Sequence, residues 1–420
     1  MTNIFKPKIL ETLKSYSKKQ FVSDVIAGII VAIIALPLSI ALAIASGAPP
    51  EKGIYTAIIA GFFISLLGGS RVNISGPTAA FATIVAGIIA KNDFDGLIIA
   101  TIMAGIILIL MGLLRLGSLI KYIPHTITTG FTSGIAVTIL VGQIKDFLGL
   151  TFDKGTHAVE TSEKISAIAN SLDTLNPWAL LVGAIGLLLL ILWPRVNQKI
   201  PASLIAVIVG TLIVKTLSIN AETIGDLYTI TSDLPKLSLP KLDTKLIISL
   251  LPDAFTIALL AGIESLLSCV VSDTMISDKH NSNTELIAQG VGNIFSGLFG
   301  GIPATGAIAR TAANVKNGGR SPISGITHAL VLLLVLVLLM PLAAWIPMPI
   351  IAAILFIVAY NMSEWRVFVK IIKTSPLTDK IILVLTFLLT VAFNLVIAIV
   401  VGMVLHIIIL LINKASKKNA

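Results

Sequence analysis

The sequence has few charged residues and a single cysteine. Only 12% of its 420 residues are charged, whereas soluble domains carry about 25%. So few charges could not cover the apolar surface of a chain that is 56% hydrophobic, so a water-soluble fold is excluded. Cys269 has no partner cysteine, which excludes a disulfide bond within the chain and leaves the redox compartment open.

Enzyme motifs are also missing. The sequence contains no Walker A loop, no H-E-x-x-H pair and no nucleophile elbow. We therefore expect no enzymatic activity and no bound cofactor. The net charge of +9 could suggest nucleic acid in a soluble protein, but in a membrane protein Lys and Arg gather in the cytoplasmic loops. We expect no nucleic-acid partner.

Apolar runs occupy nearly the whole chain from Val25 to Leu411, and the mean hydropathy is +0.99. Each run is long enough, at about 20 residues, to cross the hydrocarbon core of a bilayer. We predict an all-α polytopic membrane protein with about 14 segments, and we expect the first to be retained, because no cleavage site follows it. The segments begin near residues 23, 52, 75, 94, 123, 175, 200, 247, 283, 304, 321, 348, 378 and 395, with Asn394 dividing the last pair.

The distribution of positive charge predicts the orientation. With the N-terminus in the cytoplasm, about two thirds of the 30 Lys and Arg residues fall on the cytoplasmic side. This arrangement places both termini in the cytoplasm of a cell whose plasma (inner) membrane holds the protein. The long polar segments 146–176 and 218–244 then lie outside.

The second polar segment leaves seven spans on each side of it. An odd number of spans per half gives the halves opposite orientations, so we predict two inverted repeats. The predicted units are a cytoplasmic N-terminal segment (1–22), a first repeat (23–217), a polar extracytoplasmic linker (218–246), a second repeat (247–413) and a cytoplasmic tail (414–420).

The third and tenth spans are short and interrupted by Gly and Pro. The third opens at residues 74–83 and the tenth at residues 301–311, so both take the third position of their repeat. Ordinary kinks are an alternative for either one alone. A matched pair, however, is the best sequence indication of a transporter's binding site.

Interrupted helices suit an anion, because the first N–H groups of a helix lack partners and its dipole is positive at that end. Arg310 adds a fixed positive charge at the same depth. An arginine that reaches the interface or pairs with a glutamate is the alternative. The predicted substrate site comprises Pro77, Thr78, Ala79, Ala80, Gly306, Ala307, Ile308 and Arg310.

Glu264 is the one carboxylate predicted near the middle of the membrane, and Ser268 lies one turn further on the same face. Glu264 could bind a proton, or it could coordinate sodium together with Ser268 and backbone carbonyls. A structural pair with Arg310 is the alternative. His328 and His406 lie in apolar runs and are predicted to be packed structural residues rather than proton carriers.

Several stretches of the chain resemble the sulfate permease (SulP) family, equivalent to solute carrier family 26. In the first half they include Ala35-Leu36-Pro37, Ala45-Ser46-Gly47 and residues 68–78. In the second half they are residues 264–273, 279–293 and 300–310, with Gly318-Gly319. The resemblance covers essentially the whole chain.

The resemblance implies a core and a gate domain, a substrate site between the third and tenth spans, and elevator-like alternating access. In cyanobacterial sodium/bicarbonate members a sodium ion binds in the eighth and tenth spans. The matching positions here are Glu264, Ser268, Gly306, Ala307 and Ile308, and the family's arginine in the tenth span matches Arg310.

The chain also departs from the family. Glu264 replaces Asp and Ile308 replaces a hydroxyl residue, which favours a proton over sodium. Leu38 and Leu42 stand where many members carry Gln and Tyr. Most members have a STAS domain after the last span, whereas this sequence ends at Ala420, either naturally or by truncation.

These observations favour a secondary transporter of small inorganic anions, sulfate or bicarbonate first, coupled to H⁺ or Na⁺ within a lipid bilayer. The sequence does not distinguish between these two anions. An uncoupled exchanger or channel, and a dicarboxylate or nucleobase transporter of the same fold, are the alternatives. A homodimer is a candidate assembly.

Overall fold

The computed structural model describes residues 5–118, 124–153, 158, 160–197, 200–240, 243–393 and 395–418. The first half contains α1 (Lys8–Thr12), η1 (Leu13–Ser15), α2 (Lys18–Ala45), α3 (Pro50–Leu67), β1 (Ser75–Gly76), η2 (Ala79–Phe81), α4 (Ala82–Leu113), α5 (His125–Leu148), α6 (Thr161–Asn170), η4 (Leu172–Thr174), α7 (Pro177–Val196) and α8 (Ala202–Thr216). The second half contains α9 (Ile224–Leu227), α10 (Thr244–Ile276), α11 (Ser282–Leu298), β2 (Thr305–Gly306), α12 (Ile308–Lys316), α13 (Pro322–Leu339), η5 (Met340–Trp345), α14 (Met348–Met362), α15 (Trp365–Thr374), α16 (Leu377–Ala392) and α17 (Leu395–Lys418).

The helices confirm the predicted all-α membrane fold. Eight helices within the described residues are long and apolar enough to cross a bilayer. The other predicted segments are shorter helices, such as α8 and α12, or parts of α4. α4 supplies two segments, because Asn92 and Asp93 have non-helical backbone angles and divide it near the predicted boundary. The predicted break at Asn394 lies outside the described residues.

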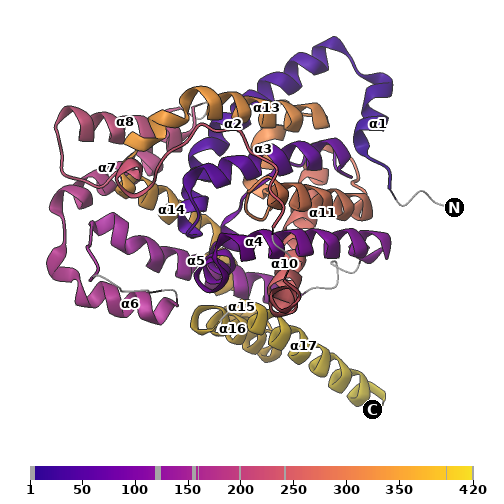
Figure 1. Ribbon diagram of the computed structural model, residues 1–420. Coiled ribbons are helices and arrows are strands. Elements are labelled where there is room, and N and C mark those ends of the chain that lie inside the picture. Colours follow the sequence, from indigo (N-terminus) through magenta and orange to yellow (C-terminus); the bar gives the residue numbers. More distant parts are fainter. Residues whose placement is uncertain are drawn as a thin grey trace.

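Packing divides the helices into a core and a gate (Figure 1). In the core, spans 1 and 2 (α2 and α3) pack on span 11 (α13), and spans 8 and 9 (α10 and α11) pack on span 4 (the second part of α4). In the gate, span 5 (α5) packs on span 13 (α16), and span 12 (α14) packs on span 6 (α7). In each group the two contacts are related by exchanging the two halves of seven spans. This relation is what two inverted repeats of seven spans require.

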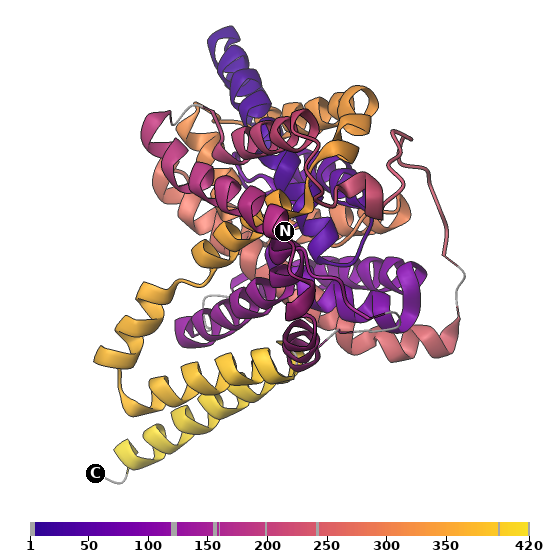
Figure 2. The ribbon, with the colours of Figure 1, turned by 90° about the vertical axis from the view of Figure 1, so that its left-hand side faces the viewer.

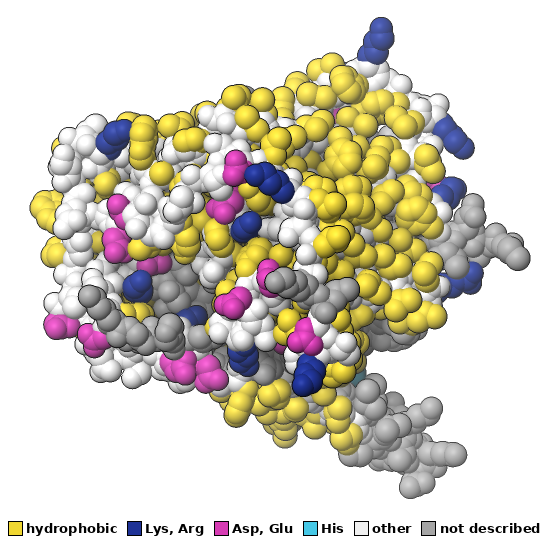
Figure 3. Space-filling model, in the orientation of Figure 1, with side chains coloured by type: hydrophobic (Ala, Val, Ile, Leu, Met, Phe, Trp, Pro, Cys, Tyr) yellow, Lys and Arg dark blue, Asp and Glu magenta, His cyan; other side chains and the backbone are white. Residues whose placement is uncertain are grey.

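The gate helices α16 and α17 lie side by side at one edge of the molecule in both ribbon views (Figure 2). Side chains on the outer faces of the helices are hydrophobic, as Figure 3 shows for one side of the molecule. They include Ile106 and Leu110 on α4, Leu330 and Leu334 on α13, and Leu388 on α16. In water such a surface would be costly, whereas lipid chains cover it without cost.

Small residues let the core helices approach closely. A Cβ atom built on Gly105 of α4 would lie 2.6 Å from the Gly290 carbonyl oxygen, and one on Gly290 of α11 would lie 2.5 Å from the Gly105 carbonyl oxygen. Neither position therefore accepts a larger residue at this helix separation. Close contact of this kind is how helices associate where lipid removes the hydrophobic drive between them.

Candidate anion site

The two interrupted segments meet inside the core. Strand β1 pairs antiparallel with β2, with Ser75 opposite Gly306 and Gly76 opposite Thr305. The Ala307 backbone N–H extends the pairing by donating to the Ile74 carbonyl at 2.8 Å. The structure thus brings the predicted residues of the third and tenth spans together.

A helix begins just after each strand. Thr78 is the N-cap of η2, which leads into α4, and Ala307 is the N-cap of α12. No side chain caps either helix start. The first backbone N–H groups of both half-helices are thus available to a ligand. In the first half-helix these are the N–H groups of Ala79 and Ala80. Ala307 is an exception, because its own N–H is used in the strand pair.

Gly306 is the position that depends most on a small residue. A Cβ atom there would lie 2.7 Å from the Asn73 amide nitrogen and 2.8 Å from its oxygen. Neighbouring Ala307 is similarly small, but Ile308 has a side chain that is 43% exposed on the isolated chain. The predicted proximity of Gly306 to the third span is thus confirmed, whereas Ile308 points out of the buried region.

Arg310 connects the two segments. Its side chain is only 3% exposed, and its Nη2 donates to the Pro77 carbonyl oxygen. Its Nη1 has no hydrogen-bond partner and lies so close to Gly76 that a Cβ atom there would be 2.6 Å away. A buried guanidinium with an unused donor is a ready contact for an anion. The alternative of an arginine that reaches the interface does not fit this burial.

Glu264 reaches toward the same place from α10. Its Oε2 accepts a hydrogen bond from Thr78 Oγ1 at 3.0 Å, and the residue is half-buried. Among the described residues it forms no ion pair with Arg310. The alternative of a structural Glu264–Arg310 pair is therefore not what the structure contains.

The Ser268 side chain, one turn from Glu264 on α10, is held by hydrogen bonds to other segments. Its hydroxyl is 2.8 Å from Asn73 Oδ1 and 3.0 Å from Thr311 Oγ1. Both partners are buried, and they also hydrogen-bond to each other. Of the residues predicted to bind sodium, Glu264 hydrogen-bonds with Thr78, and the Ser268 hydroxyl is already hydrogen-bonded. The third position is Ile308, whose side chain has no oxygen.

Glu285 is a buried carboxylate whose part in this network the sequence analysis missed. It is fully buried at the start of α11. Its Oε2 accepts from the backbone N–H groups of Gly69 (2.9 Å) and Ser70 (3.2 Å), and its Oε1 accepts from Asn73 Nδ2 at 2.8 Å. Ser265 and Gln289 supply two more donors. This carboxylate fixes the loop that leads into β1.

The sequence did contain a signal for this network. Glu285, Gln289 and Asn293 recur every four residues along α11, so they share one face. Polar groups within a bilayer must find partners, so such a stripe predicts a buried hydrogen-bond network. Asn293 satisfies the loop that leads into β2. Its side-chain oxygen accepts from the Ala304 N–H, and its side-chain nitrogen donates to the Ala304 carbonyl.

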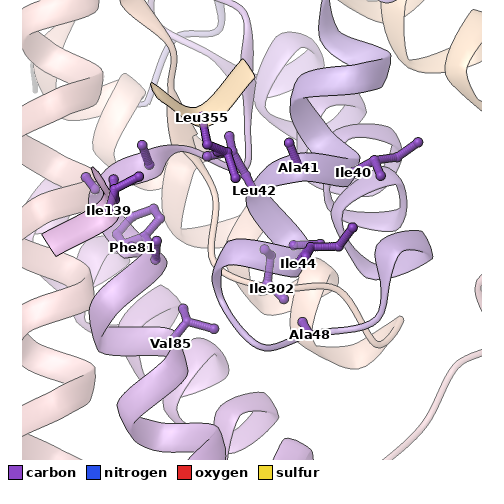
Figure 4. Packing of buried hydrophobic residues seen from close by; sticks show 14 of the residues in the cluster. Ile40, Ala41, Leu42, Ile44, Ala48, Phe81, Val85, Ile139, Ile302 and Leu355 are labelled. Carbon is purple, nitrogen blue, oxygen red and sulfur yellow. The ribbon is translucent and has the colours of Figure 1, made fainter. Parts of the chain in front are cut away.

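Apolar side chains lie where the core meets the gate beside the first half-helix. Figure 4 shows Leu42 of α2 next to Leu355 of α14, and Phe81 of η2 next to Ile139 of α5. All four are buried. Because the surroundings are dry, hydrogen bonds and charges at the half-helix starts act more strongly on an anion than they would in water.

The chain is similar to several known proteins. It is 44% identical over 398 residues to YvdB of Bacillus subtilis, covering 93% of this chain and 74% of that protein. It is 34% identical to the bicarbonate transporter BicA of Picosynechococcus, covering 90% of this chain and 68% of that protein. The solved transmembrane domain of a cyanobacterial BicA superposes with a TM-score of 0.82 at 33% identity, covering 91% of this chain and 98% of that one.

Residues 21–386 match the sequence profile of the sulfate permease family. The match spans most of the chain and includes both interrupted segments and the half-helices that follow them. With relatives of 34–44% identity over nine tenths of its length, and a fold that agrees, this chain belongs to the sulfate permease family of membrane transporters.

Proposed function

We propose that the protein is a proton-coupled secondary transporter of small inorganic oxyanions, sulfate or bicarbonate. One observation carries the proposal: the strand pair holds two uncapped half-helix starts together around a buried arginine with an unused donor. Two positive helix ends and a guanidinium together attract negative charge. The names of the family and of BicA support oxyanions as the substrate class.

Proton coupling would operate at Glu264. The carboxyl group contacts Thr78, the N-cap of the first half-helix. An anion bound at that helix start would be repelled by an ionised Glu264, and protonation of the carboxyl removes the repulsion. Anion binding and proton binding would then favour each other by the same factor, since coupling between two sites is reciprocal.

Sodium is the less favoured coupling ion. A hard cation needs several oxygen ligands, but the Ser268 hydroxyl is occupied by Asn73 and Thr311, and Ile308 offers no oxygen from its side chain. Gly306 and Ala307 could contribute backbone carbonyls only. One carboxylate remains, which suffices for a proton.

The transport movement we propose is an elevator-like displacement of the core against the gate. The core is cross-linked by hydrogen bonds that join segments far apart in sequence, so it would move as one body, while the apolar contact around Leu42 and Leu355 can slide. We further propose a plasma-membrane location with both termini cytoplasmic, as the charge distribution favours. A homodimer stays a prediction, because the structure describes one chain.

The test is uptake into proteoliposomes. Labelled sulfate and bicarbonate, with fumarate, chloride and uracil as competitors, would be measured with an imposed proton gradient, an imposed sodium gradient, or neither. Arg310→Ala should reduce oxyanion uptake by at least a hundredfold, since an unpaired buried contact to an anion is worth about 3 kcal/mol. Glu264→Gln should abolish gradient-driven accumulation while sparing part of the exchange.

Arg195→Ala, at the exposed end of α7, and Glu222→Gln, in an exposed loop, are matched controls that should transport normally. Oxyanion uptake that survives Arg310→Ala would overturn the anion site. Accumulation driven by a proton gradient in Glu264→Gln would overturn the coupling alone, and sodium-driven uptake by the unmodified protein would replace the proton with sodium.

A further inference from the structure

Helix α15, which connects gate helices α14 and α16, has two sharply different faces. Arg366, Lys370 and Lys373 follow one another at intervals of four and three residues, so they form one stripe along the helix. The rest of the circumference is almost entirely apolar. A short helix of this composition is typical of segments that lie in the plane of a membrane surface.

The position of α15 fits such a role. None of its residues is buried. It contacts the rest of the gate through α5 and α16, where the Phe368 ring lies 5.4 Å from that of Phe387. The side chains of Trp365 and Val369 stay exposed, so the apolar face is only partly covered by protein. Lipid chains are the natural cover for the remainder.

An aromatic pair indicates the depth of the helix. Trp365 Nε1 donates to the Tyr360 hydroxyl at 3.2 Å, at the junction of α14 and α15. Trp and Tyr concentrate at the boundary between lipid chains and headgroups. Twelve spans of the fourteen-span fold precede α15, and an even number returns the chain to the side of its N-terminus.

The three basic side chains have no acidic partner among the residues that the structure describes, since none of them forms a salt bridge there. The nearest carboxylates in sequence are Glu364, before the helix, and Asp379, in the first turn of α16. The stripe therefore presents unneutralised positive charge beside an apolar face.

We propose that α15 lies in the membrane interface on the side of the N-terminus and that Arg366, Lys370 and Lys373 bind the headgroups of anionic phospholipids. Lipid is the occupant because it alone supplies both parts that the helix lacks, a phosphate for the stripe and acyl chains for the opposite face. A soluble anion would meet only the first requirement. Bound lipid would hold the gate at a fixed depth while the core moves.

Tryptophan quenching by brominated lipid tests this proposal in the full-length chain. Trp365 would be kept and the other tryptophans, Trp178, Trp193 and Trp345, replaced by Phe. The protein would be reconstituted with mixtures of brominated phosphatidylglycerol and phosphatidylcholine. We expect phosphatidylglycerol to be preferred around Trp365 by at least tenfold, since each basic residue near an anionic surface contributes about fivefold.

When Arg366, Lys370 and Lys373 are replaced by Gln, the ratio of phosphatidylglycerol to phosphatidylcholine preference around Trp365 should fall to about one. The matched control replaces three exposed lysines predicted on the other side of the bilayer (Lys91, Lys236 and Lys245). That variant loses the same net charge and should keep the preference. Equal quenching by both lipids in the parent protein, or a preference that survives in the stripe variant, refutes the proposal.

A salt titration of the parent protein keeps the test decisive if the stripe variant fails to fold. The preference should decline steeply between low salt and about 1 M, because salt screens exposed charges. A preference that does not respond to salt also refutes an electrostatic headgroup site.

Discussion

The core and the gate contain similar helices but are stabilised differently. In the core, polar side chains join segments that are far apart in sequence, as Asn73 does with Glu285 and Ser268. In the gate, hydroxyl groups mostly bond back to their own helix, as Thr386 does to Ile382 and Thr390 to Thr386. The first pattern fixes a three-dimensional arrangement, whereas the second only satisfies a hydroxyl in an apolar setting.

The difference follows from what each region must hold. The core contains irregular backbone at the depth of the membrane, and such backbone survives there only if other protein groups satisfy it. Glu285 meets two backbone N–H groups before β1, and Asn293 meets Ala304 before β2. The gate helices satisfy their own backbones, so apolar packing is sufficient.

The largest expected contrast concerns helical glycines. In the core, a Cβ atom on Gly53 of α3 would lie 2.0 Å from the Ser39 carbonyl oxygen of α2. Gly53→Ala should therefore lower the free energy of unfolding by about 3 kcal/mol, because backbone cannot rotate away from the clash. In the gate, Gly142 of α5 has only the Lys164 ammonium, at 3.7 Å.

Gly142→Ala should be neutral or stabilising by up to about 1 kcal/mol, since Ala is the better helix former. Unfolding by dodecyl sulfate in mixed micelles measures both variants. Equal destabilisation of the two would mean that close approach of a neighbouring helix does not set the cost of adding a Cβ atom at these positions.

The next contrast concerns carboxylates. In Glu285→Gln one of the two carboxylate oxygens becomes an N–H₂ group. That group would face either the two backbone N–H donors now bound to Oε2 or the three side-chain donors now bound to Oε1. We expect a loss of about 2–3 kcal/mol in the free energy of unfolding. Exposed Glu222→Gln on the gate side should change it by less than about 0.5 kcal/mol. The same micelle titration is the measurement, and an unchanged Glu285→Gln would show that the network does not need the charge.

The smallest contrast compares two buried threonines. Thr311 of the core accepts from the Ile74 N–H at 3.0 Å and lies 3.0 Å from both Asn73 Oδ1 and Ser268 Oγ. Thr311→Val should lower the free energy of unfolding by about 1–2 kcal/mol, because it leaves the Ile74 N–H and the polar side chains of Asn73 and Ser268 without this partner. Thr386→Val in the gate removes only a bond to its own helix and should cost under about 0.5 kcal/mol. A reversed order would contradict the proposed division.

Sequence alone predicted the parts of this structure that depend on local pattern. The spans, the division of α4 near residue 93 and the two interrupted segments follow from hydropathy and from Gly and Pro. The meeting of those segments followed from their matched places in the two halves. The position of Arg310 beside Pro77 agrees with that reasoning.

The partners of individual polar groups were not predictable in the same way. Ser268 shares a helix face with Glu264, yet Asn73 and Thr311, from other segments, hold its hydroxyl. Glu285 looked like an acidic residue at a helix start, and only the fold shows its five donors. Which donor meets which acceptor depends on the docking of whole helices, and helix periodicity contains no information on that docking.

The strand pair also has a consequence for how the protein is made. Arg310 and Pro77, which it brings together, are 233 positions apart in the chain. While the ribosome is still producing the second half, the first interrupted segment already sits in the translocon or bilayer with its strand edge and Asn73 unmet, at the energetic cost that lipid imposes on bare polar groups. The site can therefore form only after the second half of the chain has been synthesised.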